Sequence, residues 1–253
     1  MTTIDLNCDM GEGFGRYSFG VDEQMMPYIS SANIACGCHA GDFSTMNQTV
    51  QLALKHNVAI GAHPGFPDRQ GFGRREMMML PTEIYELVLY QIGALQAFVQ
   101  ANGGKLHHVK PHGALYNMAA QNSEIAEAIA KAVYQISPNL ILYGLANSEL
   151  TKAGERLGLP VAHEVFADRT YQPNGTLTPR TEPNALITNE QLVIAQVLHI
   201  VRHGFVRAVD GTLVPIHADT VCIHGDGEKA VLFADKLNKA LVKNGVTVRA
   251  LNT

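Results

Sequence analysis

The sequence predicts an α/β protein, a parallel (β/α) barrel of seven or eight strands. Short apolar runs alternate with longer amphipathic segments along the chain, an order typical of parallel sheets. Seven or eight such units fit in 253 residues, which is a usual length for one barrel. Polar side chains also gather where several predicted strands end. We therefore expect a single barrel domain over residues 1–253, with an open doubly wound sheet as the alternative.

The strands and helices follow from composition and hydrophobic periodicity. The predicted strands are Thr3–Cys8, Ala32–Cys36, Val58–Ala62, Leu106–Lys110, Asn139–Tyr143, Val161–Val165, Thr220–His224 and Val246–Ala250. The predicted helices are Ser44–His56, which begins with a capping serine, then Pro81–Ala101, Ser123–Ser137, Ser148–Leu157, Thr188–His203 and Glu228–Asn244. Ala167–Pro183 contains three prolines and predicts a long loop, and such loops are often functional.

Composition excludes several classes of protein. The net charge of −4 and the pI near 6.2 argue against nucleic-acid binding, which usually needs a basic face. No apolar run approaches the roughly 20 residues of a membrane helix, and the first residues lack the pattern of a secretory signal. We therefore expect a cytoplasmic protein with no membrane partner. Its four cysteines are expected to be reduced and mostly buried.

The first strand shows where the polar groups point. Successive strand residues face opposite sides, so Asp5, Asn7 and Asp9 share one face and Ile4 and Leu6 the other. In a barrel the polar face is the interior, and active sites lie at its carboxyl end. One histidine alone could be structural, but four at the ends of four strands predict a common site. The catalytic candidates are Asp9, His39, His63, Lys110, His112, Glu164 and His224.

These residue types allow two kinds of chemistry. Asp9, His39 and His63 offer carboxylate and imidazole groups, which are common ligands of zinc and other divalent metals. The same groups could perform metal-free acid–base catalysis, because imidazole titrates near neutral pH. Lys110 could stabilise an oxyanion or a phosphate, and Arg169 could hold a substrate carboxylate. Both alternatives, with and without a metal, stay open at this point.

Common nucleotide and hydrolase motifs do not occur. The glycine-rich stretches Gly11–Gly15 and Gly61–Gly73 do not match the dinucleotide-binding pattern, and no P-loop is present. There is also no nucleophile elbow of the α/β-hydrolase type. If a nucleotide binds to this chain, these motifs do not reveal where.

Several longer blocks around the strand ends resemble the LamB/YcsF family. The blocks are Asp5–Glu12, Ala32–Asp42, Gly61–Asp68, Gly71–Arg75, Val109–Asn117, Glu164–Tyr171 and Ile223–Asp226. They are long, occur in order and extend over most of the chain, so the resemblance is specific. It implies a (β/α) barrel similar to the glycoside hydrolase/deacetylase superfamily.

The resemblance also implies an activity. Members of this family are similar to the A subunit of the ATP-dependent 5-oxoprolinase, which converts 5-oxo-L-proline (pyroglutamate), ATP and water to L-glutamate, ADP and phosphate. It thereby implies ATP as co-substrate, with magnesium, and subunits B and C as partners; a bound divalent metal stays open. The matched blocks supply the substrate-binding candidates Asn7, Glu12, Tyr116, Asn117, Asp168 and Arg169.

Each step of that reaction can be given candidate residues. Asp9, with His39 or His63, would activate water, and His112 or His224 would donate a proton to the departing nitrogen. Lys110 and Arg169 would meet anionic groups. Two alternatives remain. The first is a metal-dependent carbohydrate or amide deacetylase, and the second is a non-catalytic scaffold subunit whose partners carry the chemistry.

Overall fold

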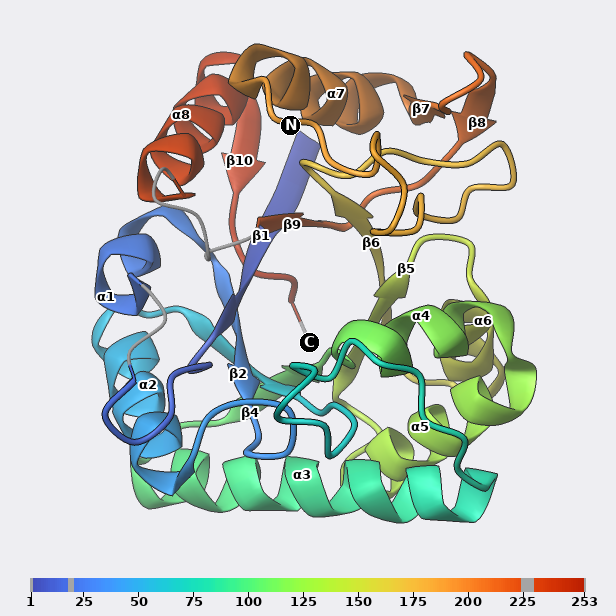
Figure 1. Ribbon diagram of the computed structural model, residues 1–253. Helices are drawn as coiled ribbons and strands as arrows, with labels where there is room; N and C mark the ends of the chain where they lie inside the picture. The colour runs from blue at the N-terminus through green and yellow to red at the C-terminus, as the bar shows by residue number, and fades with distance from the viewer. Residues whose placement is uncertain (1, 18–20, 224–229, 253) are drawn as a thin grey trace.

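The protein is a closed barrel of parallel strands surrounded by helices (Figure 1). The computed structural model describes residues 2–17, 21–223 and 230–252. The barrel strands are, in order, β1 (Thr2–Met10), β2 (Ser31–Ala35), β3 (Ala59–His63), β4 (Leu106–Val109), β5 (Ile141–Leu145), β6 (Val161–Phe166) and β9 (Thr220–Ile223). Strand β9 pairs with both β6 and β1 and so closes the ring. The predicted barrel is therefore confirmed, and it has seven strands.

The eighth predicted strand is not part of the ring. It forms β10 (Val246–Val248), which pairs with Thr2–Ile4 at the start of β1. The long β1 makes this possible, because its later residues pair with β9 and β2 instead. A small antiparallel hairpin, β7 (Phe205–Arg207) and β8 (Leu213–Pro215), lies outside the barrel and was not predicted.

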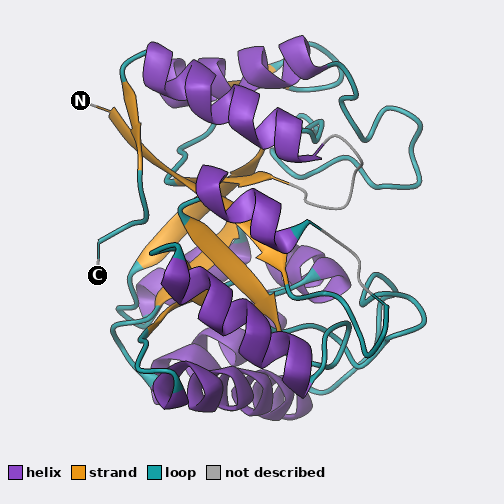
Figure 2. Ribbon diagram, turned by 90° about the vertical axis from the view of Figure 1, so that its left-hand side faces the viewer, coloured by secondary structure: helices purple, strands orange, loops and turns teal. Residues whose placement is uncertain are grey.

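Helices cover the outside of the strands (Figure 2). The helices are α1 (Asp22–Met25), the 3₁₀ turn η1 (Met26–Tyr28), α2 (Phe43–Lys55), α3 (Pro81–Ala101), α4 (Gly113–Gln121), α5 (Ser123–Ile136), α6 (Glu149–Arg156), α7 (Glu190–His203) and α8 (Ala230–Lys243). The six predicted helices are present. The short α1, η1 and α4 were not predicted.

Local hydrogen bonds decide where several helices begin. Helix α2 is capped by Asp42 and not by Ser44, because the Asp42 carboxylate accepts a hydrogen bond from the Thr45 amide. Helix α7 begins at Glu190, two residues later than predicted, because Asn189 caps it. The predicted loop after β6 is confirmed, and it is closed by isolated bridges that fold it back on itself.

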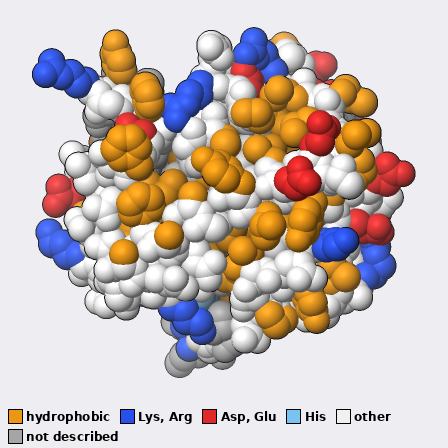
Figure 3. Space-filling view, turned by 90° about the horizontal axis from the view of Figure 1, so that it is seen from below, with side chains coloured by type: hydrophobic (Ala, Val, Ile, Leu, Met, Phe, Trp, Pro, Cys, Tyr) orange, Lys and Arg blue, Asp and Glu red, His pale blue; other side chains and the backbone are white. Residues whose placement is uncertain are grey.

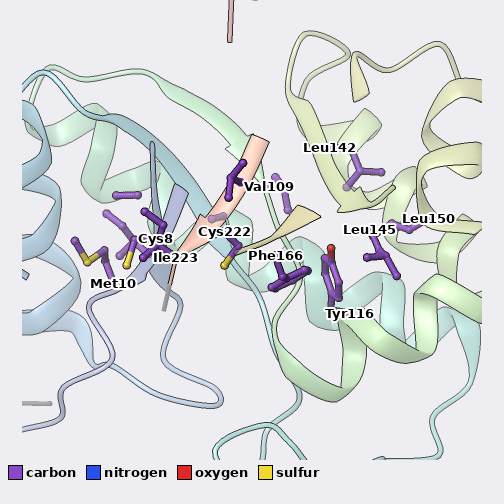
Figure 4. Packing of buried hydrophobic residues seen from close by; sticks show 14 of the residues in the cluster. Cys8, Met10, Val109, Tyr116, Leu142, Leu145, Leu150, Phe166, Cys222 and Ile223 are labelled. Carbon is purple, nitrogen blue, oxygen red and sulfur yellow. The ribbon is translucent and has the colours of Figure 1, made fainter. Parts of the chain in front are cut away.

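The two faces of the barrel strands have opposite characters. Ile4, Leu6 and Cys8 point outward into a continuous hydrophobic core beneath the helices, and Figure 4 shows part of that packing. The inward face carries polar groups that satisfy one another. The buried Asp5 carboxylate, for example, accepts hydrogen bonds from four hydroxyls, those of Ser30, Ser31, Tyr143 and Thr220. The four cysteines are free, as expected, and Cys38 is the one that is only half-buried.

Helix α3 crosses one side of the molecule and is apolar over much of its surface. Figure 3 shows many hydrophobic side chains on the face seen from below, where α3 lies in Figure 1. Tyr90 of α3 is exposed. Even so, no helix among the described residues is long and apolar enough to cross a membrane.

Candidate functional site

A cavity of about 730 Å³ opens at the carboxyl end of the barrel strands. Its volume is typical of small-molecule sites, which span roughly 300–1,000 Å³. The predicted residues that line it are Asp9, Glu12, His63, Lys110, His112, Tyr116, Asn117 and Arg169. The loop after β6 forms another part of the wall through residues Thr176 to Thr181. The cavity therefore lies at the end of the barrel where the sequence predicted a functional site.

The floor of the cavity holds a buried lysine between two carboxylates. Lys110 Nζ lies 3.0 Å from Asp9 Oδ1 and 2.9 Å from Glu164 Oε1. It also donates to Asn7 Oδ1 at 3.1 Å and lies 3.2 Å from Cys222 Sγ. An isolated buried ammonium would be very costly, so this pairing is what allows it to remain charged. We call Asp9, Lys110 and Glu164 the ion triad.

Lys110 and Asp9 provide fixed charges at neutral pH. Burial alone would lower the pKa of Lys110, but Asp9, Cys222 and Glu164 outweigh it and raise that pKa well above its usual value. Burial likewise opposes the charge on Asp9, yet the neighbouring His63 and Lys110 hold the Asp9 pKa well below its usual value. The cavity thus has a fixed cation beside a fixed anion.

Tyr116 lies over the buried end of this triad. Its ring packs edge-on against Phe166, with 5.8 Å between ring centroids (Figure 4). The Tyr116 hydroxyl is buried beside the Glu164 carboxylate. Burial and the negative charge of Glu164 raise the pKa of Tyr116 well above its usual value, so this phenol keeps its proton.

Three buried imidazoles form a second group next to the ion triad. His39 and His112 stack in parallel with ring centroids 3.8 Å apart and 5° between their planes. His63 stands edge-on to both rings. We call His39, His63 and His112 the imidazole group.

Glycine makes room for this group. A Cβ on Gly73 would lie 2.7 Å from the His39 Cβ and 2.8 Å from the His112 Cδ2, and Gly73 has a φ of +64°. A Cβ on Gly65 would lie 2.7 Å from the His39 Nδ1. These two glycines therefore allow the backbone to approach the imidazole rings closely.

Backbone carbonyls fix the outer nitrogens of two of these rings. His63 Nδ1 lies 2.7 Å from the Lys110 carbonyl oxygen, and His112 Nε2 lies 2.8 Å from the Phe72 carbonyl oxygen. A carbonyl oxygen can only accept, so both of these nitrogens carry hydrogen. The inner nitrogens, His63 Nε2 and His112 Nδ1, are 2.9 Å apart.

Two carboxylates flank the imidazole group. Asp9 Oδ2 lies 3.3 Å from His63 Nε2. Glu12 Oε1 lies 3.4 Å from His39 Nε2 and 3.8 Å from His112 Nδ1. One ligand atom each from Glu12, His39, His63 and His112 falls within 4.8 Å of the others, a spacing that a metal ion could bridge. Asp9, which the sequence predicted as a ligand, adjoins this group through His63.

The remaining predicted residues have different surroundings. Arg169 lines the cavity, but its guanidinium donates to the carbonyl oxygens of Thr178 at 2.5 Å and Ala185 at 3.2 Å, which holds the loop after β6 in place. Burial lowers the pKa of Arg169 to about 10, so it remains a cation. Asn7 and His39 lie behind the cavity wall, Asp168 is half-buried outside it, and His224 lies outside the described residues.

The structure adds residues to the wall that sequence reasoning missed. They are chiefly Phe72, Arg74, Phe166 and Arg180. Arg74 belongs to a block that resembles the family, and Arg180 lies in the predicted functional loop. The family resemblance and the loop prediction pointed to the segments that contain Arg74 and Arg180. Only the folded structure shows that both guanidinium groups adjoin the same cavity.

Buried histidines should make the fold sensitive to mild acid. Burial lowers the pKa of His112 to about 3 and those of His39 and His108 well below their usual value. As pH falls below 6.5 the unfolded chain therefore takes up protons that the folded chain refuses, and stability decreases. We expect the free energy of unfolding to fall by about 1 kcal/mol per pH unit for each such histidine.

Urea unfolding between pH 7.5 and 5.5, in buffer free of divalent metals, measures this effect. An unchanged free energy of unfolding over that interval would show that these imidazoles are not held neutral.

Comparisons with known proteins identify the family to which the chain belongs. Residues 4–253 match the model of the LamB/YcsF family. A protein of Brevibacillus brevis, named as the A subunit of 5-oxoprolinase, is 60% identical over 99% of this chain and 98% of its own length. One of Bacillus mycoides with the same name is 60% identical over the full length of both chains. A lactam utilization protein of Thermus thermophilus has a solved structure with a TM-score of 0.93 and 46% identity, covering 99% of this chain and 100% of that one.

Proposed function

Because the chain belongs to the LamB/YcsF family, we propose that it acts as the A subunit of an ATP-dependent 5-oxoprolinase. In this proposal the enzyme opens the lactam ring of 5-oxo-L-proline to L-glutamate while ATP is split to ADP and phosphate, with subunits B and C as partners. Relatives of that name, 60% identical over nearly the whole chain, support it. The observation that carries it is the ion triad in the floor of the cavity, which suits the opening of an amide.

The difficulty of this reaction lies in the stability of the lactam. Transfer of the γ-phosphoryl group of ATP to the carbonyl oxygen makes the ring carbon electrophilic, and water can then add to it. Loss of phosphate at this stage would only regenerate the lactam. Productive collapse therefore breaks the C–N bond, leaves an acyl phosphate, and needs a second water to release glutamate and phosphate. The site has to favour departure of the nitrogen.

The cavity offers groups that can activate water, stabilise the oxyanion and assist departure of the nitrogen. Asp9 is ionised and accepts a hydrogen bond from the attacking water, while Lys110 offers a fixed positive charge to the developing oxyanion. The proton that Asp9 takes from this water passes to the departing nitrogen, and Tyr116, which keeps its own proton, can donate a hydrogen bond toward the same nitrogen. Glu164 lies beneath these groups and acts by positioning Lys110.

Three arginines of the wall complete the proposed site. Arg74, Arg169 and Arg180 supply positive charge for the carboxylate of 5-oxo-L-proline and for the phosphoryl group. Of these, Arg169 also holds the loop after β6, so its substitution would affect the shape of the cavity as well as its charge.

Substitutions at the cavity separate a catalytic role from a scaffold role. We expect Asp9→Ala to reduce glutamate formation by the assembled enzyme at least about 100-fold, since a positioned acid–base group contributes roughly that much. His63→Ala should have a similar effect, because His63 Nε2 lies 3.3 Å from Asp9 Oδ2 and helps to hold that carboxylate. The matched controls are Asp210→Ala and His203→Ala, which alter exposed residues that do not line the cavity. If both cavity variants retained wild-type turnover within a normally assembled complex, the scaffold alternative would hold.

The second candidate function is a metal-dependent amide or carbohydrate deacetylase. The spacing of Glu12 and the imidazole group favours it, because a metal-activated water hydrolyses amides without ATP. Its test is the release of acetate from N-acetylated sugars by the isolated chain with added zinc and without ATP. Metal-stimulated release would support this candidate over the 5-oxoprolinase.

A further inference from the structure

We propose that this chain binds one divalent transition-metal ion between His63 Nε2 and His112 Nδ1, with carboxylate oxygens of Asp9 and Glu12 as further ligands. This inference does not rest on the proposed 5-oxoprolinase activity, and for the deacetylase candidate it names the ligand atoms. It differs from the ligand set expected from the sequence, because it replaces His39 by His112 and Glu12.

The first step is a count of hydrogen atoms. His63 Nδ1 and His112 Nε2 each donate to a backbone carbonyl, those of Lys110 and Phe72. When both rings are neutral, each carries one N–H, so the other nitrogen of each ring presents a lone pair. Those two lone-pair nitrogens face each other at 2.9 Å, a distance at which two acceptors repel. A cation between them removes the repulsion.

Two carboxylates approach the same pair of imidazole nitrogens and would also favour a cation there. Asp9 Oδ2 approaches His63 Nε2 at 3.3 Å, so a third acceptor atom meets the pair. Glu12 Oε1 faces His112 Nδ1 from another side at 3.8 Å. Asp9 Oδ2 and His112 Nδ1 thus both lie close to His63 Nε2, and Glu12 Oε1 adjoins His112 Nδ1 in turn. Lys110 is already paired with Asp9 Oδ1 and Glu164, on the far side of the Asp9 carboxylate.

The spacing of these atoms suits a small ion. Zinc bound to imidazole nitrogen at about 2.0–2.1 Å in a tetrahedral site keeps its ligand atoms about 3.3 Å apart. The separations of 2.9, 3.3 and 3.8 Å bracket that value. Two imidazoles with two carboxylates select zinc or a similar first-row ion over calcium or magnesium, which prefer oxygen ligands alone.

The outer hydrogen bonds resemble the supports of known metal sites. Metal-bound histidines usually donate their other N–H to a carbonyl or carboxylate, which fixes the ring. His63 and His112 both do so here.

His39 is not assigned as a metal ligand, because of the orientation of its ring. It stacks on His112 with planes only 5° apart, so its in-plane lone pairs cannot point at an ion that lies in the plane of His112. We therefore assign His39 as a positioning residue that holds Glu12 through the 3.4 Å contact of its Nε2.

Metal titration of the purified full chain tests the proposal without any substrate. The chain is treated with a chelator, dialysed, and titrated with Zn(II) by calorimetry and with Co(II) by visible absorption. We expect one ion per chain, and Co(II) bands typical of a site with bound nitrogen. His63→Gln and His112→Gln should each weaken binding by more than about 100-fold, and His39→Gln by about 10- to 100-fold. His203→Gln, at an exposed helix end, should leave binding unchanged.

Two results would overturn the proposal. One is the absence of stoichiometric binding by folded wild-type chain, which would leave a shared proton between the two imidazoles. The other is unchanged binding by the folded His63→Gln/His112→Gln double variant, which would make the metal adventitious. Circular dichroism of each variant confirms folding. Since the readout is binding, its failure is distinguishable from a failure of 5-oxoprolinase activity.

Discussion

Replacing Lys110 with methionine is expected to reduce glutamate formation by the complete enzyme at least about 100-fold, the usual effect of removing one group that stabilises an oxyanion. Methionine keeps most of the side-chain volume but removes the charge. Asp9 and Glu164 then lose the cation that both contact within about 3 Å. Because one partner of a buried ion pair is lost, we also expect the free energy of unfolding to fall by about 3 kcal/mol.

The matched control is Lys152→Met, which removes an exposed lysine that pairs with Glu149 on the surface of α6. Surface pairs of this kind contribute little, so its stability and turnover should remain close to wild type. Turnover in the complete complex and urea unfolding of the chain alone give the two readouts. Wild-type turnover by a fully folded Lys110→Met chain would remove Lys110 from the mechanism.

Gly61→Ala is expected to cause a large loss of stability inside the barrel. A Cβ at this position would lie 2.1 Å from His108 Nε2. His108 cannot move aside easily, because it donates to Asn33 Oδ1 at 2.8 Å and stacks on Tyr143 at 4.2 Å. Overpacking of a filled interior costs up to about 3 kcal/mol, and we expect Gly61→Ala to reach that value. Urea unfolding at neutral pH measures it.

Two further variants make this prediction specific. Gly93→Ala changes a glycine inside α3 where an added Cβ meets nothing within 4 Å, so it should stabilise the chain by about 0.5–1 kcal/mol. In a His108→Ala background, Gly61→Ala should cost much less, because the obstructing ring is gone. Equal costs of Gly61→Ala in both backgrounds would contradict the proposed clash.

Side-chain alternation predicted the barrel, and it predicted which strand faces are polar. In β1 it separated Asp5, Asn7 and Asp9 from the hydrophobic core, and the structure confirms that division. It also indicated that the ends of several strands meet, and His63 and Lys110 indeed face one cavity. Alternation works here because the barrel interior is polar, so its two strand faces differ in composition.

Other features depend on contacts that sequence patterns do not contain. Val246–Val248 has the composition of a barrel strand, but β1 already has β9 beside its later residues. Helix α4 is short and follows directly after His112, so its periodicity was too brief to recognise. The roles of His39 and Glu164 follow from stacking and burial, which only the folded chain defines.

The central claim is that this chain is required for ATP-dependent opening of 5-oxo-L-proline. The most direct test is glutamate release from 5-oxo-L-proline by the purified chain with its candidate subunits B and C, with each protein and ATP omitted in turn. We predict glutamate only when ATP and all three proteins are present. Equal glutamate release when this chain is left out would contradict the account, and the metal-dependent deacetylase would then be the function to test.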